Sequence, residues 1–320
     1  MTIPEVPPGR LVMLVEGASF CLSGPDGDIE PRTGTGGGLF VADRRLLSTF
    51  VLRVNGQVPQ VVDHHLADPA AAVFVTRARG VSAGGQGPVV VRRRTLAAGL
   101  RDDIDVRNAG DEPTYVQIEV DVAADLAEVA AARVGRVDVD PVEPEVAGPA
   151  EVLLVRGRGP ARVGSRVTAA PDAVATGGTF RWEAIVPARG SRGFTVAVAP
   201  IVEGAEIRRR VLLGEAEPRS ESARRLARWQ RGVPRVASDH RPLVAAVERG
   251  ARDLGSLQVL DPEVPERAVV AAGAPWHLAL HGRDALLTAW MSMIADPDLA
   301  LATLETLARF QGSDVDDRTE

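Results

Sequence analysis

The 320-residue sequence contains no lysine, a single cysteine and no long run of apolar residues. All 37 basic residues are arginine, and no physical requirement excludes lysine from a whole protein surface, so we attribute this to the codon bias of the genome. Cys21 has no second cysteine with which to form an internal disulfide, as is typical of proteins in the reducing cytoplasm. Because no segment approaches the roughly 18 apolar residues of a membrane span, we expect no membrane partner.

The charge of the chain is also poorly suited to nucleic acid. The net charge is −6, whereas proteins that bind nucleic acid present basic faces. The first residues, MTIPEVPPGRLVMLVEG, lack a basic segment followed by a long apolar one, so we expect no secretory signal. These features favour a cytoplasmic protein with an uncharged or weakly charged partner.

Short valine-rich runs, separated by Gly, Pro, Asn and Asp, fill the first two thirds of the chain. Residues 115–122 alternate polar and apolar side chains, the period of a half-buried strand. Asn55-Gly56 is the strongest short signal for a hairpin turn. We therefore predict a large antiparallel β-sandwich over residues 1–215, with a barrel as the alternative. Further strands are expected at residues 11–15, 46–54, 72–76, 89–93, 152–155, 179–186 and 193–198.

Helical periodicity replaces this pattern after Pro218. Residues 220–230 carry apolar side chains at helical spacing, so a connecting helix is expected within a linker over residues 216–237. Ser238-Asp239 is expected to cap the next helix. The apolar face of that helix carries Leu243, Val247, Ala251 and Leu254.

Two more helices are predicted near the end of the chain. One begins near Gly282, and the other begins at Pro297, where proline suits the first helical turn, and ends at Gly312. Residues 238–320 are thus predicted to be all-α, built from helix hairpins.

The most informative residues are Arg283 and Asp284 at the start of the first of these helices, with Trp276 seven residues before Arg283. A carboxylate accepts hydrogen bonds, a guanidinium donates them in a fixed fork, and an indole offers an apolar face to the C–H surface of a sugar. This combination indicates a site that binds sugar hydroxyls. The alternative is a structural ion pair at a helix start, with Trp276 in the core.

Several of these motifs resemble the bacterial glycogen-debranching (amylo-alpha-1,6-glucosidase-like) family. The glycine-rich run and the Asp43-Arg44-Arg45 triplet that follows it are similar to the family pattern, although Arg44 stands where the family has Thr. His277 and His281 stand where family members usually have aromatic residues. The segments that carry the resemblance are residues 34–48, 52–59, 272–276, 282–284 and 307–312.

The resemblance implies a β-sandwich followed by an (α/α)6 toroid, a ring of twelve helices. In such toroids an Arg-Asp pair at an early helix start binds the non-reducing glucosyl unit. This role would fall to Arg283 and Asp284, with Trp276 as a stacking wall, on an α-glucan or oligosaccharide. Residues 235–320 suffice for about three or four helices of ordinary length. We therefore expect a truncated N-terminal portion without the catalytic acid and base, inactive alone and needing no cofactor.

Other motifs are weaker. Gly80-Val81-Ser82-Ala83-Gly84 matches the nucleophile elbow of hydrolases, but a strand-like run follows it instead of the required helix. The glycine cluster at residues 34–38 lacks the spacing of a phosphate-binding loop and indicates a tight turn or close backbone approach. His277 and His281 have the spacing of a zinc pair, but the only third ligand that could be proposed nearby is Asp284, so no metal site is predicted.

Two rivals to the enzyme interpretation remain. One is a non-catalytic carbohydrate-binding or scaffolding protein that uses a face of the sandwich. The other is a decayed gene product without a function. No pattern in the sequence specifies the oligomeric state.

Overall fold

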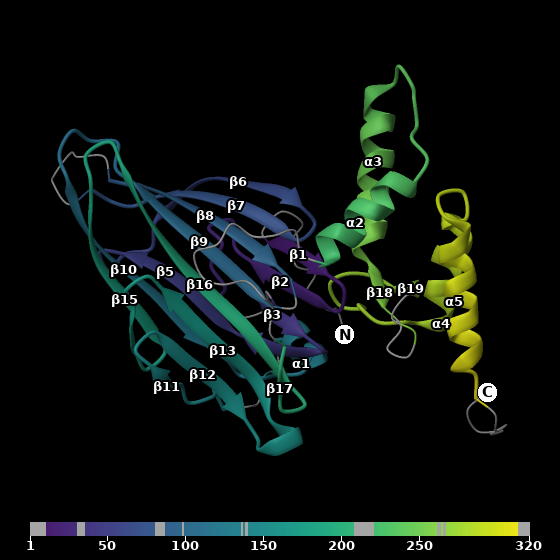
Figure 1. The fold of residues 1–320 in the computed structure, drawn as a ribbon, viewed down its shortest axis with the longest axis horizontal. Helices are drawn as coiled ribbons and strands as arrows, with labels where there is room; N and C mark the ends of the chain where they lie inside the picture. Colours follow the sequence, from purple (N-terminus) through teal and green to yellow (C-terminus); the bar gives the residue numbers. More distant parts are fainter. Residues whose placement is uncertain are drawn as a thin grey trace. The chain divides into compact units, whose positions relative to one another are not determined.

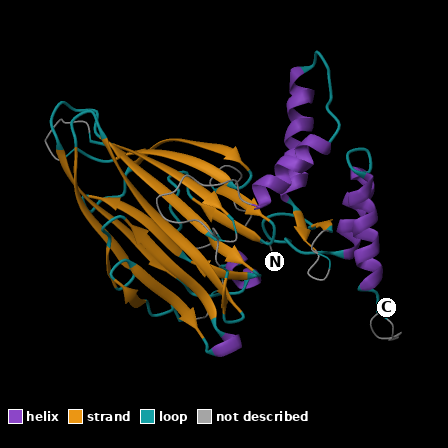
Figure 2. Ribbon diagram, viewed as in Figure 1, coloured by secondary structure: helices purple, strands orange, loops and turns teal. Residues whose placement is uncertain are grey.

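The computed structural model describes residues 11–30, 36–80, 87–97, 99–135, 137, 140–207, 221–260, 264 and 267–312. The chain divides into two compact units, residues 1–220 and 221–320. Strands dominate the first unit and helices the second, as Figure 2 shows. Residues 81–84 of the nucleophile-elbow pattern, the start of the glycine run and the final residues 313–320 lie outside the described residues.

The first unit consists of three antiparallel sheets (Figure 1). Among the described strands, each sheet path is open, with edge strands at both ends, as in the predicted sandwich. One sheet has the order β1 (Val12–Glu16), β2 (Ser19–Ser23), β3 (Gly38–Val41), β4 (Arg44–Leu47). The second has the order β14 (Val174–Thr176), β15 (Thr179–Val186), β10 (Thr114–Ala123), β5 (Thr49–Val54).

The third sheet is the largest, with nine strands. Its order is β11 (Glu145–Gly148), β12 (Glu151–Arg156), β13 (Val163–Ala170), β16 (Ser191–Val202), β9 (Leu100–Arg107), β8 (Val89–Leu96), β7 (Ala71–Arg77), β6 (Gln60–Asp68), with β17 (Ala205–Glu206) paired to β16. The short helix α1 (Val129–Arg133) and a 3-10 turn (Gly159–Ala161) complete the described part of the unit.

The alternation predicted for residues 115–122 is confirmed in β10. Val116, Ile118 and Val120 are fully buried, whereas Tyr115 is exposed. The strand pairs with β15 on one side and β5 on the other, so its apolar face points into the core that the sheets share. The two-residue period thus located both the strand and its buried face.

The Asn55-Gly56 turn forms, but it does not connect two paired strands. Asn55 and Gly56 both have positive φ, at 53° and 74°, as a tight hairpin turn requires. Val54 and Gln57 exchange backbone hydrogen bonds of 2.8 and 3.2 Å across it. The flanking strands β5 and β6 then enter different sheets, so the turn is a crossing between layers.

Gly38, in the glycine cluster, lies close to another part of the backbone. A Cβ built there would lie 2.6 Å from Cδ of Arg45 and 2.9 Å from the carbonyl oxygen of Leu47. Arg45 is itself buried, with Nε donating to Oδ1 of Asp125 at 3.1 Å and Nη1 donating to the carbonyl of Gly37 at 3.2 Å. Glycine is required because a side chain would displace Arg45 from this network.

A cluster of four charged residues lies in the core of the first unit. Arg92 pairs with Asp28 and, at 2.7 Å, with Asp102, and Arg94 reaches the same Asp102 oxygen at 2.7 Å. Both guanidinium groups lie over the ring of Phe50, at 5.5 and 5.1 Å. All four side chains are at most 2% exposed. From the sequence alone, the Arg92–Arg94 run could be a solvated face or an anchor to neighbouring acids such as Asp102, and the structure shows the anchor for Arg92 and Arg94.

The two carboxylates of this cluster differ in their pKa. Burial raises the pKa of Asp28 to about 6, and the attraction of Arg92 only partly opposes this effect. Burial also acts on Asp102, but Arg92 and Arg94 together outweigh it and hold the pKa of Asp102 below its usual value. The difference follows from the number of arginines that pair with each carboxylate.

We predict that Asp28 makes the stability of the first unit pH-dependent. Between the ordinary pKa of 3.8 and about 6, folded Asp28 holds a proton that the unfolded chain has released. Its contribution to the free energy of unfolding therefore falls as the pH rises through this window, by up to about 3 kcal/mol. Urea unfolding at pH 4, 5, 6 and 7 should show that the free energy of unfolding of wild type declines with pH relative to that of Asp28→Asn. An identical pH dependence of the free energy of unfolding in the two proteins would refute this assignment.

The second unit combines helices with one short hairpin of strands. Its elements are α2 (Glu221–Gly232), α3 (Arg241–Ser256), β18 (Gln258–Leu260), β19 (Ala268–Val270), α4 (Gly282–Ser292) and α5 (Pro297–Arg309). The predicted starts at Gly282 and Pro297 are confirmed. The expectation of an all-α segment was wrong, because β18 and β19 pair antiparallel. Among the described residues, no helix is both long and apolar enough to span a membrane.

The prediction for α3 needs two corrections. His240, and not Ser238 or Asp239, is the N-cap, because its Nδ1 accepts from the amide of Leu243 at 3.1 Å. Leu243 and Val247 are 48% and 37% exposed, so the predicted apolar face is not buried at this end of the helix. The core of the unit instead gathers around Trp229, Val270 and Leu299.

Candidate functional site

A short closed loop precedes α4 and contains Trp276. Gly273 and His277 exchange two backbone hydrogen bonds of 3.0 Å, and the amide of Ala272 donates to the carbonyl of Ala279 at 3.0 Å. These hydrogen bonds join the two ends of the loop and hold its backbone. Trp276 occupies its turn with a half-buried side chain, so part of the indole is accessible.

Arg283 and Asp284 occupy the first turn of α4. The helix begins after His281, whose side chain does not cap it, while the amide of Ala285 donates to the carbonyl of His281 at 2.8 Å. An acidic residue in a first turn is favoured by the positive end of the helix dipole. Glycine at residue 282 leaves the helix start open to solvent.

The two side chains form only a loose pair. Nε of Arg283 lies 3.5 Å from Oδ1 of Asp284, and the side chains are 85% and 44% exposed. Exposed pairs of this kind contribute about 0–1 kcal/mol, so little free energy holds the two groups to each other. Both the donor fork and the carboxylate are therefore available to a ligand.

His277 and His281 lie beside this pair. Their rings contact edge to face with centroids 5.5 Å apart, and Nδ1 of His281 lies 3.2 Å from the carbonyl oxygen of Ala279. Within the described part of the chain, no group of three His, Cys, Asp or Glu residues is placed to hold a metal ion. The two histidines contact each other, and His281 directly precedes the first turn of α4.

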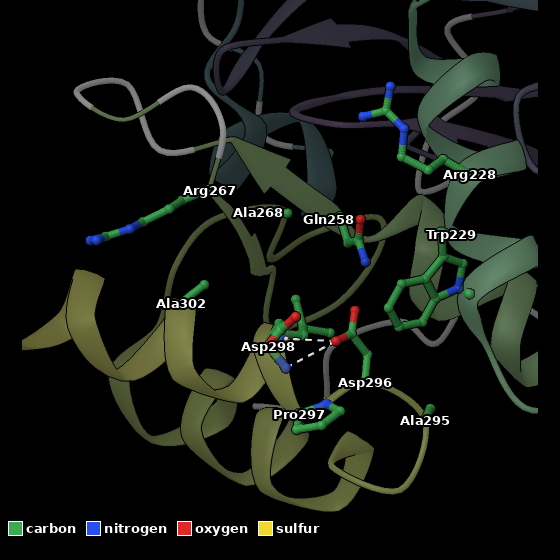
Figure 3. Close-up of a pocket in the computed structure, with 12 residues that line it drawn as sticks. Arg228, Trp229, Gln258, Arg267, Ala268, Ala295, Asp296, Pro297, Asp298 and Ala302 are labelled. Carbon is green, nitrogen blue, oxygen red and sulfur yellow. Dashed lines mark hydrogen bonds between the residues drawn. The ribbon is translucent and has the colours of Figure 1, made fainter.

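Sequence reasoning missed a cavity in the same unit, of about 530 Å³, that does not include Trp276, Arg283 or Asp284 (Figure 3). It is lined by residues of α2, the β18–β19 hairpin and the start of α5, among them Trp229, Gln258 and Asp296. The sequence carried one usable signal, Asp296-Pro297, which marks a helix start. It carried none for the meeting of three segments that lie far apart along the chain.

The comparisons with known proteins place the chain in a family. A family described as the "N-terminal domain of (some) glycogen debranching enzymes" matches residues 14–197, more than half of the chain. The chain therefore belongs to this family. Trp276, Arg283 and Asp284 lie outside the matched range. No curated protein matches the chain.

Solved structures include 44 chains that match this one. One is described as "Putative kojibiose phosphorylase from human microbiome", with 10% sequence identity and a TM-score of 0.42. The match covers 77% of the present chain and 36% of that chain. The chain thus spans about a third of the length of that protein.

Proposed function

We propose that the chain is the N-terminal portion of a debranching-type glycoside hydrolase acting on α-glucans. Arg283 and Asp284 would hold a glucosyl unit through its hydroxyl groups, and Trp276 would form one wall. The observation that carries this proposal is the open Arg283–Asp284 pair at the start of α4, which offers donors and an acceptor that other side chains hardly engage. The family of the first unit supports the choice of an α-glucan.

We also propose that α3, α4 and α5 begin an (α/α)6 toroid. The support is the exposed apolar side chains at the end of α4 and just after it, where Trp290 and Met291 are 70% and 76% exposed and Ile294, in the following turn, is 91% exposed. In a completed ring such side chains would pack against further helices. Inverting hydrolysis requires two carboxyl groups about 6.5–9.5 Å apart, and Asp284 supplies only one. The general acid and base would thus come from other parts of the complete enzyme, and this chain alone would bind without hydrolysing.

We predict that Asp284→Asn weakens binding of a soluble maltooligosaccharide at least about tenfold. A hydrogen bond to a charged group contributes about 1.5–3 kcal/mol, and each 1.4 kcal/mol is a factor of ten in Kd. Isothermal titration calorimetry of the full chain measures the change. The matched control is Asp253→Asn, the same change at an exposed carboxylate of α3 that pairs with Arg249 at 2.8 Å. Equal affinities of wild type and Asp284→Asn would contradict the assignment.

A second candidate is a non-catalytic carbohydrate-binding protein that uses the sandwich. A hollow of about 300 Å³ on β10, β14 and β15 favours it, lined by Glu119, Asp121, Val174, Thr176, Thr179 and Arg181. Its charges are already engaged, since Arg181 pairs with Glu119 at 2.6 Å and Thr179 donates to Asp121 at 2.7 Å. Binding that survives Asp284→Asn but is lost in Arg181→Gln would favour this candidate.

A further inference from the structure

The cavity beside Gln258 has the features of a second ligand site. Its volume of about 530 Å³ falls within the range of small-molecule pockets. It adjoins the turn that follows the end of α4, whereas Arg283 and Asp284 lie in the first turn of that helix. An 11-residue helix is about 16 Å long. The cavity is therefore separate from the Arg283–Asp284 pair.

Gln258 is the strongest sign of a ligand. The residue is only 4% exposed, and its backbone is held in the β18–β19 pairing with Val270. Its side-chain amide makes no hydrogen bond within the described part of the chain, and its atoms are not among the fully buried unpartnered ones, so the amide borders the cavity that Gln258 lines. Figure 3 shows this amide between Trp229 and Asp296, facing the cavity. A ligand with both donor and acceptor groups would satisfy it.

Asp296 provides an acceptor on the other side of the cavity. Its Oδ1 caps α5 by accepting from the amides of Asp298 and Leu299, at 2.9 and 3.4 Å. Its second oxygen is turned toward Gln258 (Figure 3). This oxygen is left to accept a hydroxyl from a ligand.

Trp229 supplies an apolar wall. Its Nε1 donates to the carbonyl of Ala251 at 2.7 Å, so the polar edge of the indole is engaged within the unit. The carbon edge faces Gln258 and Asp296 (Figure 3). An apolar ring beside an amide and a carboxylate suits the mixed C–H and O–H surface of a sugar.

The charges around the cavity favour a neutral ligand. Two arginines, Arg228 and Arg267, balance two aspartates, Asp296 and Asp298. Arg267 is engaged with Glu305 at 2.6 Å and points away from Gln258 (Figure 3). The carboxylate of Asp296 beside Gln258 would repel an anion, and Arg228 at the exposed side of the cavity would repel a cation.

We propose that this cavity is a second saccharide-binding site, which takes one or two neutral sugar units between Gln258, Asp296 and Trp229. The choice of sugar rests on the proposed α-glucan function, whereas the location rests on the unpartnered Gln258 amide. The site would hold a second part of a long glucan at the end of α4 opposite the Arg283–Asp284 pair.

Calorimetric titration of the full chain with maltose tests the proposal. Wild type is expected to bind two equivalents of maltose. Gln258→Leu keeps the side-chain volume but removes the amide, and its affinity at one of the two sites is expected to fall at least tenfold. Gln230→Leu, the same change at an exposed residue of α2 outside the cavity, is expected to bind like wild type. Unchanged binding by folded Gln258→Leu would overturn the proposal, as would binding of inorganic phosphate in place of maltose.

Two further variants separate the possible failures. Asp284→Asn removes the other proposed site, so maltose binding that survives Asp284→Asn and is lost in Gln258→Leu supports the second site even if the first fails. If Gln258→Leu does not fold, Asp296→Ser replaces it, because serine can still cap α5 but lacks the second carboxylate oxygen. Undiminished two-site binding by Asp296→Ser would also overturn the proposal.

Discussion

Asp102→Asn is expected to lower the free energy of unfolding of the β-rich unit by about 3–5 kcal/mol, the usual result of breaking a buried ion pair. Asp102 is the carboxylate that Arg92 and Arg94 share, at 2.7 Å each, in a part of the core that water does not reach. Without the charge of Asp102, Arg92 would keep Asp28 as its counter-charge, whereas Arg94 would lose the carboxylate with which it pairs. Urea denaturation followed by circular dichroism measures the loss.

The neighbouring residue on β9 gives the control. Asp103 pairs with Arg101 at 2.9 Å, but its side chain is 39% exposed, so Asp103→Asn should cost at most about 1 kcal/mol. Adding Arg94→Met to Asp102→Asn should recover part of the loss, because it removes one unbalanced charge. Equal effects of the two Asp→Asn changes would show that the buried network does not stabilise the fold.

The 320-residue chain is expected to self-associate through the apolar surface of α4 and α5. Besides Trp290, Met291 and Ile294, this surface exposes Leu301, Leu304 and Phe310 at 54–59%. Contiguous apolar patches larger than a few hundred Å² are rare on monomeric proteins. Light scattering coupled to size exclusion should therefore show a mass above 33.8 kDa that rises with concentration. Replacing Trp290, Met291 and Ile294 by Glu should restore a monomer.

A matched pair of substitutions on the β-rich unit tests whether the association depends on the surface of α4 and α5 and not on exposed apolar residues elsewhere. Val174 and Ile185 are 60% and 62% exposed, yet they lie on the sandwich. Changing both to Glu should leave the association of the chain intact. A monodisperse wild-type monomer with one cooperative thermal transition would contradict the expectation.

The sequence was most informative where a local rule also decides the structure. The two-residue period of β10 and the helix starts at Gly282 and Pro297 depend on neighbours in sequence, and they were predicted correctly. The Asn55-Gly56 turn was also correct as a turn. Its strands enter separate sheets because β5 pairs with the distant strand β10, whereas β6 pairs with β7, the next strand along the chain.

What local rules do not decide depends on distant partners. The sequence offered Asp102 as a partner for the Arg92–Arg94 run, and both Arg92 and Arg94 pair with it, but nothing in the sequence indicated that Asp28, far along the chain, also pairs with Arg92. β18 and β19 are too short, at three residues each, to show a period. Of the candidate site, the sequence predicted the adjacent pair Arg283–Asp284. The cavity at Gln258 could not be predicted, since its walls come together only in the folded unit.

The buried position of Cys21 allows thiol labelling to detect opening of the β-rich unit. It is the only thiol in the chain and is fully buried beside Arg94, and burial raises the pKa of that thiol. A thiol reagent can therefore modify it only when the β-rich unit opens. The rate of Cys21 labelling in native buffer would measure how often the β-rich unit opens. Opening of the helical unit alone would not change this rate, because that unit contains no cysteine.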